Sequence, residues 1–134
     1  MVLPRFVEAA MAGRALVVHD DGQQERCFAH VSDVVGAVTK LMQTESSYGR
    51  IYNIGADEPI SILKMAKRVV AIVNPKATIE FQSYAQAYDD DFEDIRRRVP
   101  NLTRIREAIG YAPTRFLDDI IRDVWSEMFK QAAL

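Results

Sequence analysis

Apolar residues recur at helical spacing in several parts of the 134-residue chain. One such run begins at Val34, and a longer run occupies positions 62–73. Recurrence every three to four residues is typical of helices that bury one face. The pattern predicts helices over 4–13, 33–44, 62–73 and 102–110 and a last helix with an apolar face from Phe116 to Phe129. Each helix after the first has a candidate cap: Ser32 or Asp33 for 33–44, Ser61 for 62–73, Asn101 for 102–110 and Thr114 for the last helix.

Shorter apolar runs lie between these helices and predict strands. They occupy residues 15–19, 26–31, 50–55 and 77–82, with a turn at "DDG" and a polar loop over 83–100. Helices that alternate with strands indicate an α/β fold. Four short strands are few for a complete doubly wound sheet, so we expect the fold to be part of something larger.

Composition and charge restrict the possible functions. Hydrophobic residues make up 49% and charged residues 27% of the chain, and the formal net charge is −2. This balance argues against a general nucleic-acid surface, which requires an excess of basic residues. The apolar runs are too short to span a membrane, and the opening segment is a poor signal peptide. We therefore expect a cytoplasmic protein that contacts neither nucleic acid nor a membrane.

No catalytic, cofactor or metal motif can be recognised in the sequence. The glycines at 13, 22, 36, 49, 55 and 110 form neither a G-x-G-x-x-G motif nor a P-loop. No tyrosine is followed four positions later by lysine. His19 and His30 lie in expected strands without ligand spacing, which favours structural roles. Cys27, the single cysteine, is interpreted as a structural thiol.

Two arginines are candidates for holding an anion. Arg26 opens an expected strand, and Arg98 precedes Val99 and Pro100. Two guanidinium groups can clamp a diphosphate through paired hydrogen bonds. Alternatively, residues 96–98 form surface ion pairs with the acids at 89–94, and the residues alone leave both alternatives open. The same holds for two loop tyrosines, which either lie on the surface or line a ligand: Tyr84 and Tyr88.

Three ordered segments resemble a known family. They are "LPRFVEAAMAGRALVVHDDGQQERCFAHVSDVVGAV", "IYNIGADEPISILKMAKRV" and "RRRVPNLTRIREAIGYAPTRFLDDII". Together they resemble the C-terminal part of extended short-chain dehydrogenases/reductases, the NAD-dependent nucleotide-sugar epimerases, dehydratases and decarboxylases. Two stretches, "FEDIRRRVPN" and "ISILKMAKRV", are most similar to UDP-glucose 4-epimerase and UDP-glucuronate decarboxylase. The resemblance implies that the chain is an incomplete part of a Rossmann-type epimerase. The resemblance implies that residues 1–134 form a single nucleotide-sugar-binding region with a UDP-sugar as its ligand.

The resemblance also implies roles for individual residues. Arg26, in "GQQERCF", and Arg98, in "RVPN", correspond to the family's phosphate-binding arginines. Val17 would offer backbone hydrogen bonds to the base, and His19 would cover the face of the base. Residues of the first helix would form a wall near the nucleotide, namely Pro4 and Phe6.

The sequence departs from the family pattern at several positions. His19 stands where the family usually has an aromatic residue, and Asp20 stands where it often has glycine. Glu25 replaces the usual threonine and would weaken the hold of Arg26 on phosphate if the two side chains met. Asn101 replaces the usual aspartate but can still cap a helix.

The family's NAD-binding and catalytic half has no counterpart in the sequence. The chain alone is therefore expected to bind no NAD and to catalyse nothing, although NAD is the cofactor of the parent enzymes. In the family, the helix at 33–44 and the strand at 51–54 pack on that half. Their apolar surface is thus expected to be exposed and to favour a homo-oligomer. The alternative function is a non-catalytic, self-associating interaction module or a remnant fragment.

Overall fold

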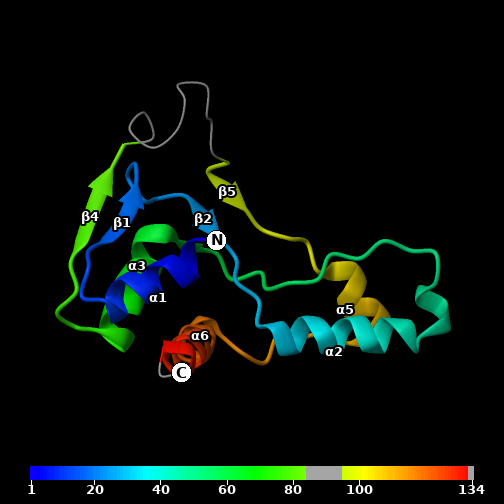
Figure 1. The fold of residues 1–134 in the computed structure, drawn as a ribbon. Coiled ribbons are helices and arrows are strands. Elements are labelled where there is room, and N and C mark those ends of the chain that lie inside the picture. The colour runs from blue at the N-terminus through cyan, green and yellow to red at the C-terminus, as the bar shows by residue number, and fades with distance from the viewer. Residues whose placement is uncertain (84–94, 133–134) are drawn as a thin grey trace.

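The computed structural model describes residues 1–83 and 95–132 as a body from which a long arm projects (Figure 1). The body comprises residues 1–30, 56–83, 95–98 and 114–132, and the arm comprises residues 31–55 and 99–113. The helices are α1 (Val2–Met11), α2 (Val31–Met42), the 3-10 turn η1 (Glu45–Ser47), α3 (Ile62–Val73), α5 (Thr103–Ile109) and α6 (Leu117–Ala132). The strands are β1 (Leu16–His19), β2 (Glu25–Arg26), β3 (Ile60–Ser61), β4 (Ile79–Gln82) and β5 (Arg97–Arg98).

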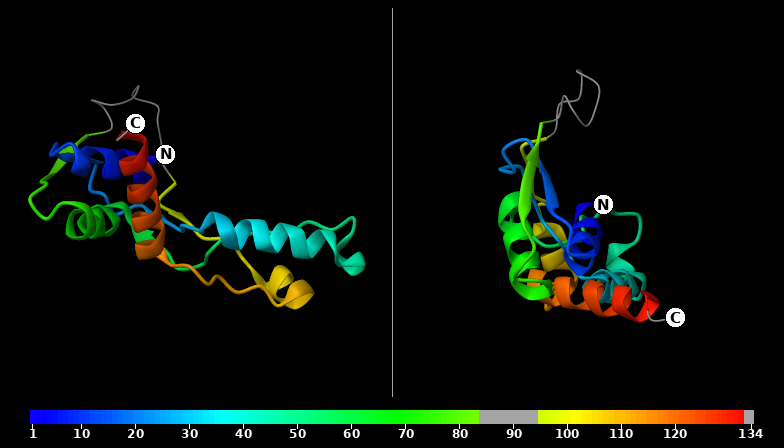
Figure 2. Two further views of the ribbon diagram at one scale, coloured as in Figure 1. Left: turned by 60° about the horizontal axis from the view of Figure 1, so that its bottom comes forward. Right: turned by 60° about the vertical axis from the view of Figure 1, so that its left-hand side comes forward.

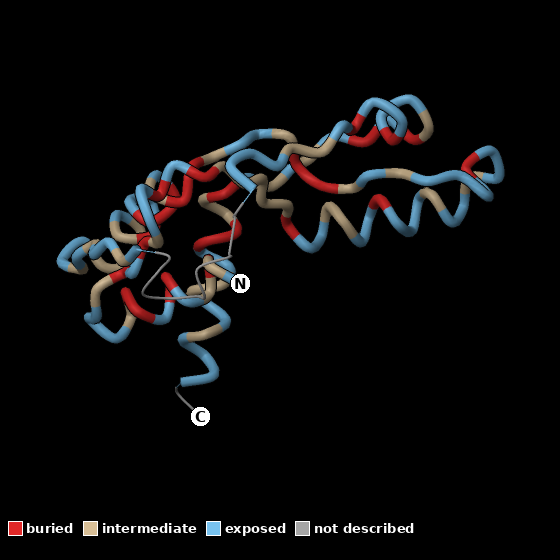
Figure 3. The backbone as a smooth tube through the Cα atoms, turned by 90° about the horizontal axis from the view of Figure 1, so that it is seen from above, coloured by how far each residue is buried: buried red, intermediate tan, exposed pale blue. Residues whose placement is uncertain are grey.

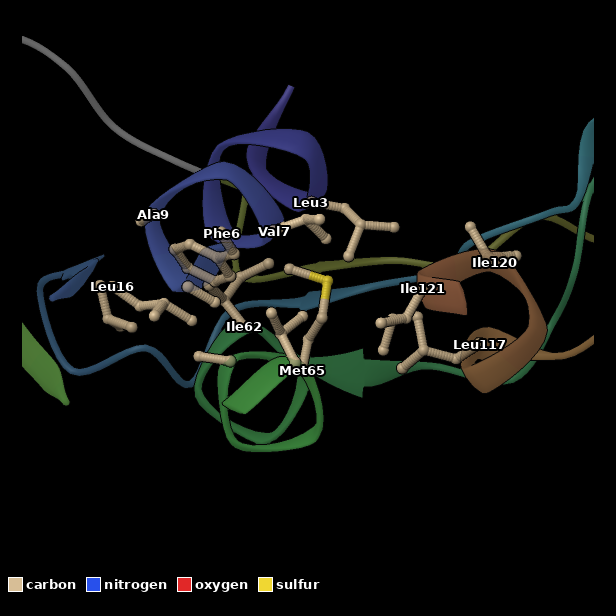
Figure 4. Close-up of a cluster of buried hydrophobic side chains, with 14 residues drawn as sticks. Leu3, Phe6, Val7, Ala9, Leu16, Ile62, Met65, Leu117, Ile120 and Ile121 are labelled. Atoms are coloured by element: carbon tan, nitrogen blue, oxygen red, sulfur yellow. The ribbon is translucent and has the colours of Figure 1, made fainter. Parts of the chain in front are cut away.

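The core of the body lies between three helices and one parallel strand pair. β1 pairs with β4 from Leu16 opposite Ile79 to His19 opposite Gln82. Helix α1 packs against β1, α3 and α6, and α3 also packs against α6. Figure 4 shows their apolar side chains pointing toward one another. The largest fully buried side chains of this cluster include Leu16, Met65 and Ile121.

A second, very short sheet connects the body to the arm. Its strand order is β3-β2-β5, with β2 antiparallel to β3 and parallel to β5. Each of these strands is only two residues long. The sheet therefore stabilises the fold little by itself, but it fixes the register of β2 against β5.

Local sequence signals explain two of the helix ends. The Ser61 hydroxyl accepts a hydrogen bond from the Lys64 amide and caps α3, as predicted. Helix α5 ends at Gly110, whose φ of 64° lies in the left-handed region that glycine adopts without strain. The Asn101 side chain accepts from the Thr103 amide at the other end of α5.

The arm consists mainly of α2 and α5, which lie side by side away from the body (Figures 1 and 2). They share a small apolar cluster of their own, formed by Ala37, Leu102, Ile105, Ile109 and Tyr111. The buried Tyr111 hydroxyl donates to the Gly55 carbonyl over 2.7 Å. The arm therefore has its own core and is not an extension of the core of the body.

One face of α2 carries an uncovered apolar stripe. Ala37 is the only α2 residue that the arm cluster fully buries, and Figure 3 shows most of this helix exposed. We call the exposed side chains Val31, Val35, Val38 and Met42 the α2 stripe. They have 69%, 57%, 41% and 71% of their surface exposed, and Ile51 nearby in the arm has 81% exposed. The apolar surface expected to be exposed at 33–44 is thus exposed along the stripe, whereas at 51–54 Ile51 is exposed and Tyr52 and Ile54 pack on the arm cluster.

Several predictions of secondary structure were wrong. The N-cap of α2 is His30 and not Ser32 or Asp33, and the predicted loop over 83–100 contains β5. Residues 51–54 form no strand, because no described strand pairs with them, and the side chains of Tyr52 and Ile54 pack on the arm cluster. The segment at 26–31 pairs as a strand only at Arg26, and α2 already begins at Val31. The last helix begins at Leu117 and is not capped by Thr114, whose amide and hydroxyl donate to the Asp33 carboxylate. No helix in the described part of the chain has the length and apolar character of a membrane span.

Candidate functional site

Arg26 and Arg98 lie side by side on neighbouring strands. They are register partners in the parallel pairing of β2 with β5. Adjacent strands are about 4.8 Å apart, and partners in register project from the same face of a sheet. The short pairing thus brings together two arginines that are far apart in the sequence.

The acid next to Arg26 lies on the other face of this sheet. Successive side chains of a strand point to opposite faces, so Glu25 projects away from Arg26. Glu25 is the register partner of Arg97, and its Oε2 atom is 3.1 Å from the Arg97 Nε atom. The Glu25 carboxylate is therefore held by Arg97 and not by Arg26.

Both arginines line one cavity of about 750 Å³. Its other walls come from the start of α1, the segment that leads into α2, and one side of α6. These walls are largely apolar and include Leu3, Phe28 and Val124. A mostly apolar cavity with a few convergent polar groups is the usual form of a small-molecule site.

The two arginines differ in how firmly they are held. The Arg26 Nη1 atom donates to the backbone oxygens of Glu25 over 2.8 Å and of Ile95 over 2.7 Å. Arg26 is half-buried, whereas Arg98 is exposed. The site therefore combines one anchored guanidinium with one at the surface.

The neighbouring arginines form ion pairs with other residues. Arg96 lies 3.0 Å from the Asp21 carboxylate, and Arg97 pairs with Glu25. These side chains are well exposed, so each pair contributes little to stability. The acids at 89–94, expected as alternative partners, lie outside the described residues.

Strand β1 presents Val17 on its open edge. The Leu16 amide donates to the Thr78 carbonyl just before β4, and the Asp20 amide donates to the Gln82 carbonyl of β4. In a parallel ladder, alternate residues direct their peptide groups to opposite edges. The Val17 peptide group is therefore directed away from β4, and its side chain is 40% exposed. His19 is half-buried on the same strand. Neither residue is among the described side chains that line the cavity of Arg26 and Arg98.

A tight turn follows β1 and requires glycine. Gly22 has φ of 66°, and a Cβ atom there would lie 2.6 Å from the Val18 Cγ1 atom. The Gly22 amide donates to the His19 carbonyl. The turn directs the chain from β1 into β2 and so sets the position of Arg26.

The remaining predicted site residues lie in different places. Pro4 lines the cavity. Phe6, which was expected to form a wall with it, is only 3% exposed and lies in the core of the body. Its side chain faces inward because it shares the buried face of α1 with Val7 and Ala10. The structure does not describe residues 84–94, so the predictions for Tyr84 and Tyr88 lie outside its range.

His30 has a role that the sequence did not reveal. Its Nδ1 atom accepts from the Ser32 amide and lies 2.6 Å from the Ser32 hydroxyl, and its Nε2 atom lies 2.9 Å from the Asp123 carboxylate. This order resembles a hydrolytic triad. However, the ring occupies the Ser32 amide, which such a site would need for an oxyanion. His30 is instead the N-cap of α2, a position for which histidine gives no strong sequence signal.

Cys27 and the acidic residues do not point to metal or nucleophile chemistry. Burial is the main cause that raises the pKa of the Cys27 thiol above its ordinary value, with Asp57 adding to the shift. A raised pKa favours the thiol over the nucleophilic thiolate. Among residues 1–83 and 95–132, no group of three or more His, Cys, Asp or Glu side chains is arranged to hold a metal ion.

The described residues do not fit a dinucleotide. Binding the diphosphate of NAD in the usual way requires a strand, a glycine-rich turn and the start of a helix in succession. Here β1 continues through the Gly22 turn into β2 and not into a helix. The candidate site therefore consists of two arginines at a largely apolar cavity, on an α/β scaffold whose β1 is not followed by the usual dinucleotide turn.

Comparison with known proteins places this scaffold in a class. Residues 1–55 match the model of the NAD dependent epimerase/dehydratase family. The chain is 36% identical over 112 residues to UDP-N-acetyl-alpha-D-glucosaminuronate decarboxylase of Bacillus cytotoxicus, covering 84% of this chain and 35% of the relative. It is 32% identical over 112 residues to UDP-glucuronic acid decarboxylase 2 of Arabidopsis thaliana, covering 84% of this chain and 23% of the relative.

Solved structures confirm the fold class. UDP-glucuronic acid 4-epimerase from Bacillus cereus, in complex with UDP-glucuronic acid and NAD, superposes with a TM-score of 0.85 at 20% identity. The alignment covers 98% of this chain and 40% of that structure. The chain is thus homologous to NAD-dependent nucleotide-sugar epimerases, dehydratases and decarboxylases. It spans about a third or less of the two curated relatives, with 35% and 23% covered.

Proposed function

We propose that the chain is the nucleotide-sugar-binding region of an NAD-dependent epimerase, dehydratase or decarboxylase. Its ligand would be a UDP-sugar, held by the diphosphate through Arg26 and Arg98. The observation that carries this proposal is the register pairing of these two arginines at one cavity. Adjacent guanidinium groups on one face of a sheet match the two phosphates of a nucleoside diphosphate.

The surroundings of the arginines support a diphosphate ligand. The Arg26 guanidinium is anchored by backbone oxygens, so little side-chain entropy remains to be lost on binding. Glu25 projects from the opposite face, where it pairs with Arg97, and does not neutralise Arg26. The Val17 peptide group on the open edge of β1 is the proposed partner of the base, with His19 covering the face of the base.

The proposed role of this chain is binding and orientation of the substrate. The structure lacks a fitting dinucleotide turn among its described residues, so we assign NAD binding to the family's other half. Relatives carry out their chemistry with the cofactor, and no reaction step is assigned to residues of this chain. We therefore expect this chain alone to show no epimerase or decarboxylase activity.

The proposal is tested by measuring UDP binding to the chain with Arg98 replaced. Arg98→Ala removes a charge-assisted contact and should weaken UDP binding roughly tenfold or more. Arg97→Ala is the matched control, because Arg97 lies one position away, on the opposite face, and pairs with Glu25. It should change the affinity less than about threefold. Isothermal titration or ligand-observed NMR gives the dissociation constants, and affinity should fall as salt rises.

Two results would contradict this assignment. One is the absence of any saturation-transfer signal from millimolar UDP. The other is an equal loss of binding in Arg97→Ala and Arg98→Ala, which would indicate a nonspecific contribution of positive charge. Either result concerns the site only and leaves the homology to the family intact.

A second candidate function is a self-associating interaction module. The observation that favours it is the α2 stripe, four apolar side chains with 41% to 71% of their surface exposed. Contiguous exposed apolar surface marks interaction sites more often than single exposed residues do. Size-exclusion chromatography with light scattering separates the candidates. A monomer that binds UDP supports the first candidate, and a tight dimer indifferent to UDP supports the second.

A further inference from the structure

A second cavity, of about 600 Å³, lies where the arm joins the body. Three arginines from separate segments line it: Arg68 from α3, Arg106 from α5 and Arg115 from the segment before α6. Two of these segments belong to the body and one to the arm. The cavity is distinct from the one that contains Arg26 and Arg98, although Phe28 lines both.

Each of the three guanidinium groups is only partly used. Arg106 contacts Asp57 through a single nitrogen, Nη2, which lies 3.1 Å and 3.0 Å from the two carboxylate oxygens. Arg115 donates from Nη2 to the Asp123 carboxylate over 2.7 Å. A guanidinium carries five N–H donors, so these contacts leave most donors available.

Arg68 and Arg115 show the clearest lack of acceptors. The Arg68 Nε atom lies 3.4 Å from the Asp118 Oδ1 atom, but that oxygen has no well-formed hydrogen bond to any described residue. The Arg115 Nε atom is buried and likewise has no acceptor in the described part of the chain. A buried donor without an acceptor costs free energy.

Each arginine of the cavity has a carboxylate partner. Arg106 pairs with Asp57, Arg68 with Asp118 and Arg115 with Asp123. Asp57 lines the cavity, whereas Asp118 and Asp123 do not. An anion would therefore bind through the donors that these ion pairs leave open.

The rest of the wall is apolar and partly aromatic. Phe28 and Phe116 line the cavity together with Pro59 and Pro113. Phe116 has 54% of its surface exposed, more than is usual for a large apolar side chain. Such walls favour a ligand whose anionic group is attached to a flat or apolar body.

We propose that this cavity binds a small organic anion, with its phosphate or carboxylate group held by Arg68, Arg106 and Arg115. The apolar part of the anion lies between Phe28 and Phe116. Because the arginines come from both body and arm, the ligand joins the two parts. The site does not depend on the proposed nucleotide-sugar function, since it uses different arginines and a different cavity.

The test uses the whole chain with three probes: inorganic phosphate, phenyl phosphate and benzoate. Binding is followed by the thermal unfolding midpoint and by amide shifts in NMR spectra. A ligand that binds only the folded chain raises the midpoint with concentration. We expect phenyl phosphate to bind more tightly than inorganic phosphate and to shift the amides of residues 57, 58, 115 and 116. The comparison of phenyl phosphate with benzoate shows which anionic group is preferred.

Substitutions assign the binding to individual arginines. Arg106→Gln and Arg115→Gln should each weaken binding of phenyl phosphate roughly tenfold or more. Arg104→Gln is the matched control, since it removes the same charge from the same helix and does not line this cavity. If either variant fails to fold, as judged by circular dichroism, phenyl phosphate binding is measured with Arg68→Gln instead. The contact of Arg68 with Asp118 is long and partly exposed, so its loss should affect stability little.

Three outcomes would overturn the proposal. One is no midpoint shift and no amide shift with any probe at tens of millimolar. The second is binding that Arg104→Gln weakens as much as Arg106→Gln. The third is binding lost in Arg98→Gln but retained in Arg106→Gln, which would place the anion in the cavity of Arg26 and Arg98. The first two outcomes do not bear on whether UDP binds at Arg26 and Arg98.

Discussion

At the scale of single residues, the Asp33 side chain forms hydrogen bonds that connect the arm to the body. Its carboxylate accepts hydrogen bonds from the amide and hydroxyl of Thr114 and from the amide of Arg115. Burial, the largest single effect, acts to raise the pKa of Asp33, but these hydrogen bonds together lower it below its ordinary value. The first turn of α2 is thereby tied to the segment that leads into α6.

Replacing Asp33 should destabilise the chain in a pH-dependent way. Because the folded-state pKa is lowered, the contribution of Asp33 to stability is fully present above the unfolded pKa of about 3.9. It is lost as the pH falls through the lower folded pKa. We expect Asp33→Ala to lower the free energy of unfolding by about 2 kcal/mol at pH 7, measured by urea denaturation.

The difference between wild type and variant should shrink below about pH 4. Asp33→Asn is the control, since it keeps one acceptor oxygen but does not titrate, and its stability should lack the Asp33 component of the pH dependence. A difference for Asp33→Ala that stays constant from pH 7 to pH 3 would show that the effect of the substitution does not come from the charge.

At the scale of elements, the long helices could be predicted because each has a cap signal or a periodic apolar face. Helix α3 has both, with Ser61 as its cap and Met65 and Val69 on its buried face. The strands were harder. β5 is two residues long, too short for any alternation to be read, and its partner β2 lies about seventy positions earlier.

The segment "RIYNIG" shows why a short apolar run alone misled. Its apolar residues predicted a strand, but Tyr52 and Ile54 pack on the arm cluster. In a strand, the Gly55 carbonyl would accept a hydrogen bond from a neighbouring strand. Here it accepts a hydrogen bond from the Tyr111 hydroxyl. The family resemblance placed several residues near one ligand. Of these, Arg26, Arg98 and Pro4 line the same cavity, whereas Phe6 lies in the core of the body.

The α2 stripe predicts self-association of the isolated chain. Burying these side chains between two copies would be favourable, since each exposed aliphatic side chain is worth about 1.5–3 kcal/mol when fully buried. We expect Val35→Glu to raise the dimer dissociation constant at least roughly tenfold, measured by analytical ultracentrifugation. The reason is that the variant would bury an unpaired charge in the contact.

Thr39→Glu is the matched control for this prediction. It introduces the same charge into the same helix, at an exposed position outside the stripe. It should leave the dissociation constant within about threefold of wild type. A chain that stays monomeric at all accessible concentrations, or a Thr39→Glu effect as large as that of Val35→Glu, would contradict the prediction.

At the scale of the whole molecule, two separate clusters share one chain. The chain runs from the body into the arm at Val31 and returns near Ala56, then leaves again after Arg98 and returns before α6. Both proposed ligand sites lie where these passages occur. The cavity of Arg26 and Arg98 flanks the first exit, and the cavity of Arg68, Arg106 and Arg115 lies between arm and body.

This path through the molecule also constrains the order in which it folds. The arm cluster joins Ala37 to Leu102, and the residues between them include α3 and β4 of the body. Closing so long a loop in an unfolded chain is entropically costly, whereas a folded body already holds its ends close together. The body should therefore fold before the arm. Fluorescence of Trp125, which packs on the body cluster, should recover before the amides of α5 gain protection in pulsed hydrogen exchange. Simultaneous recovery would mean that arm and body fold as one unit.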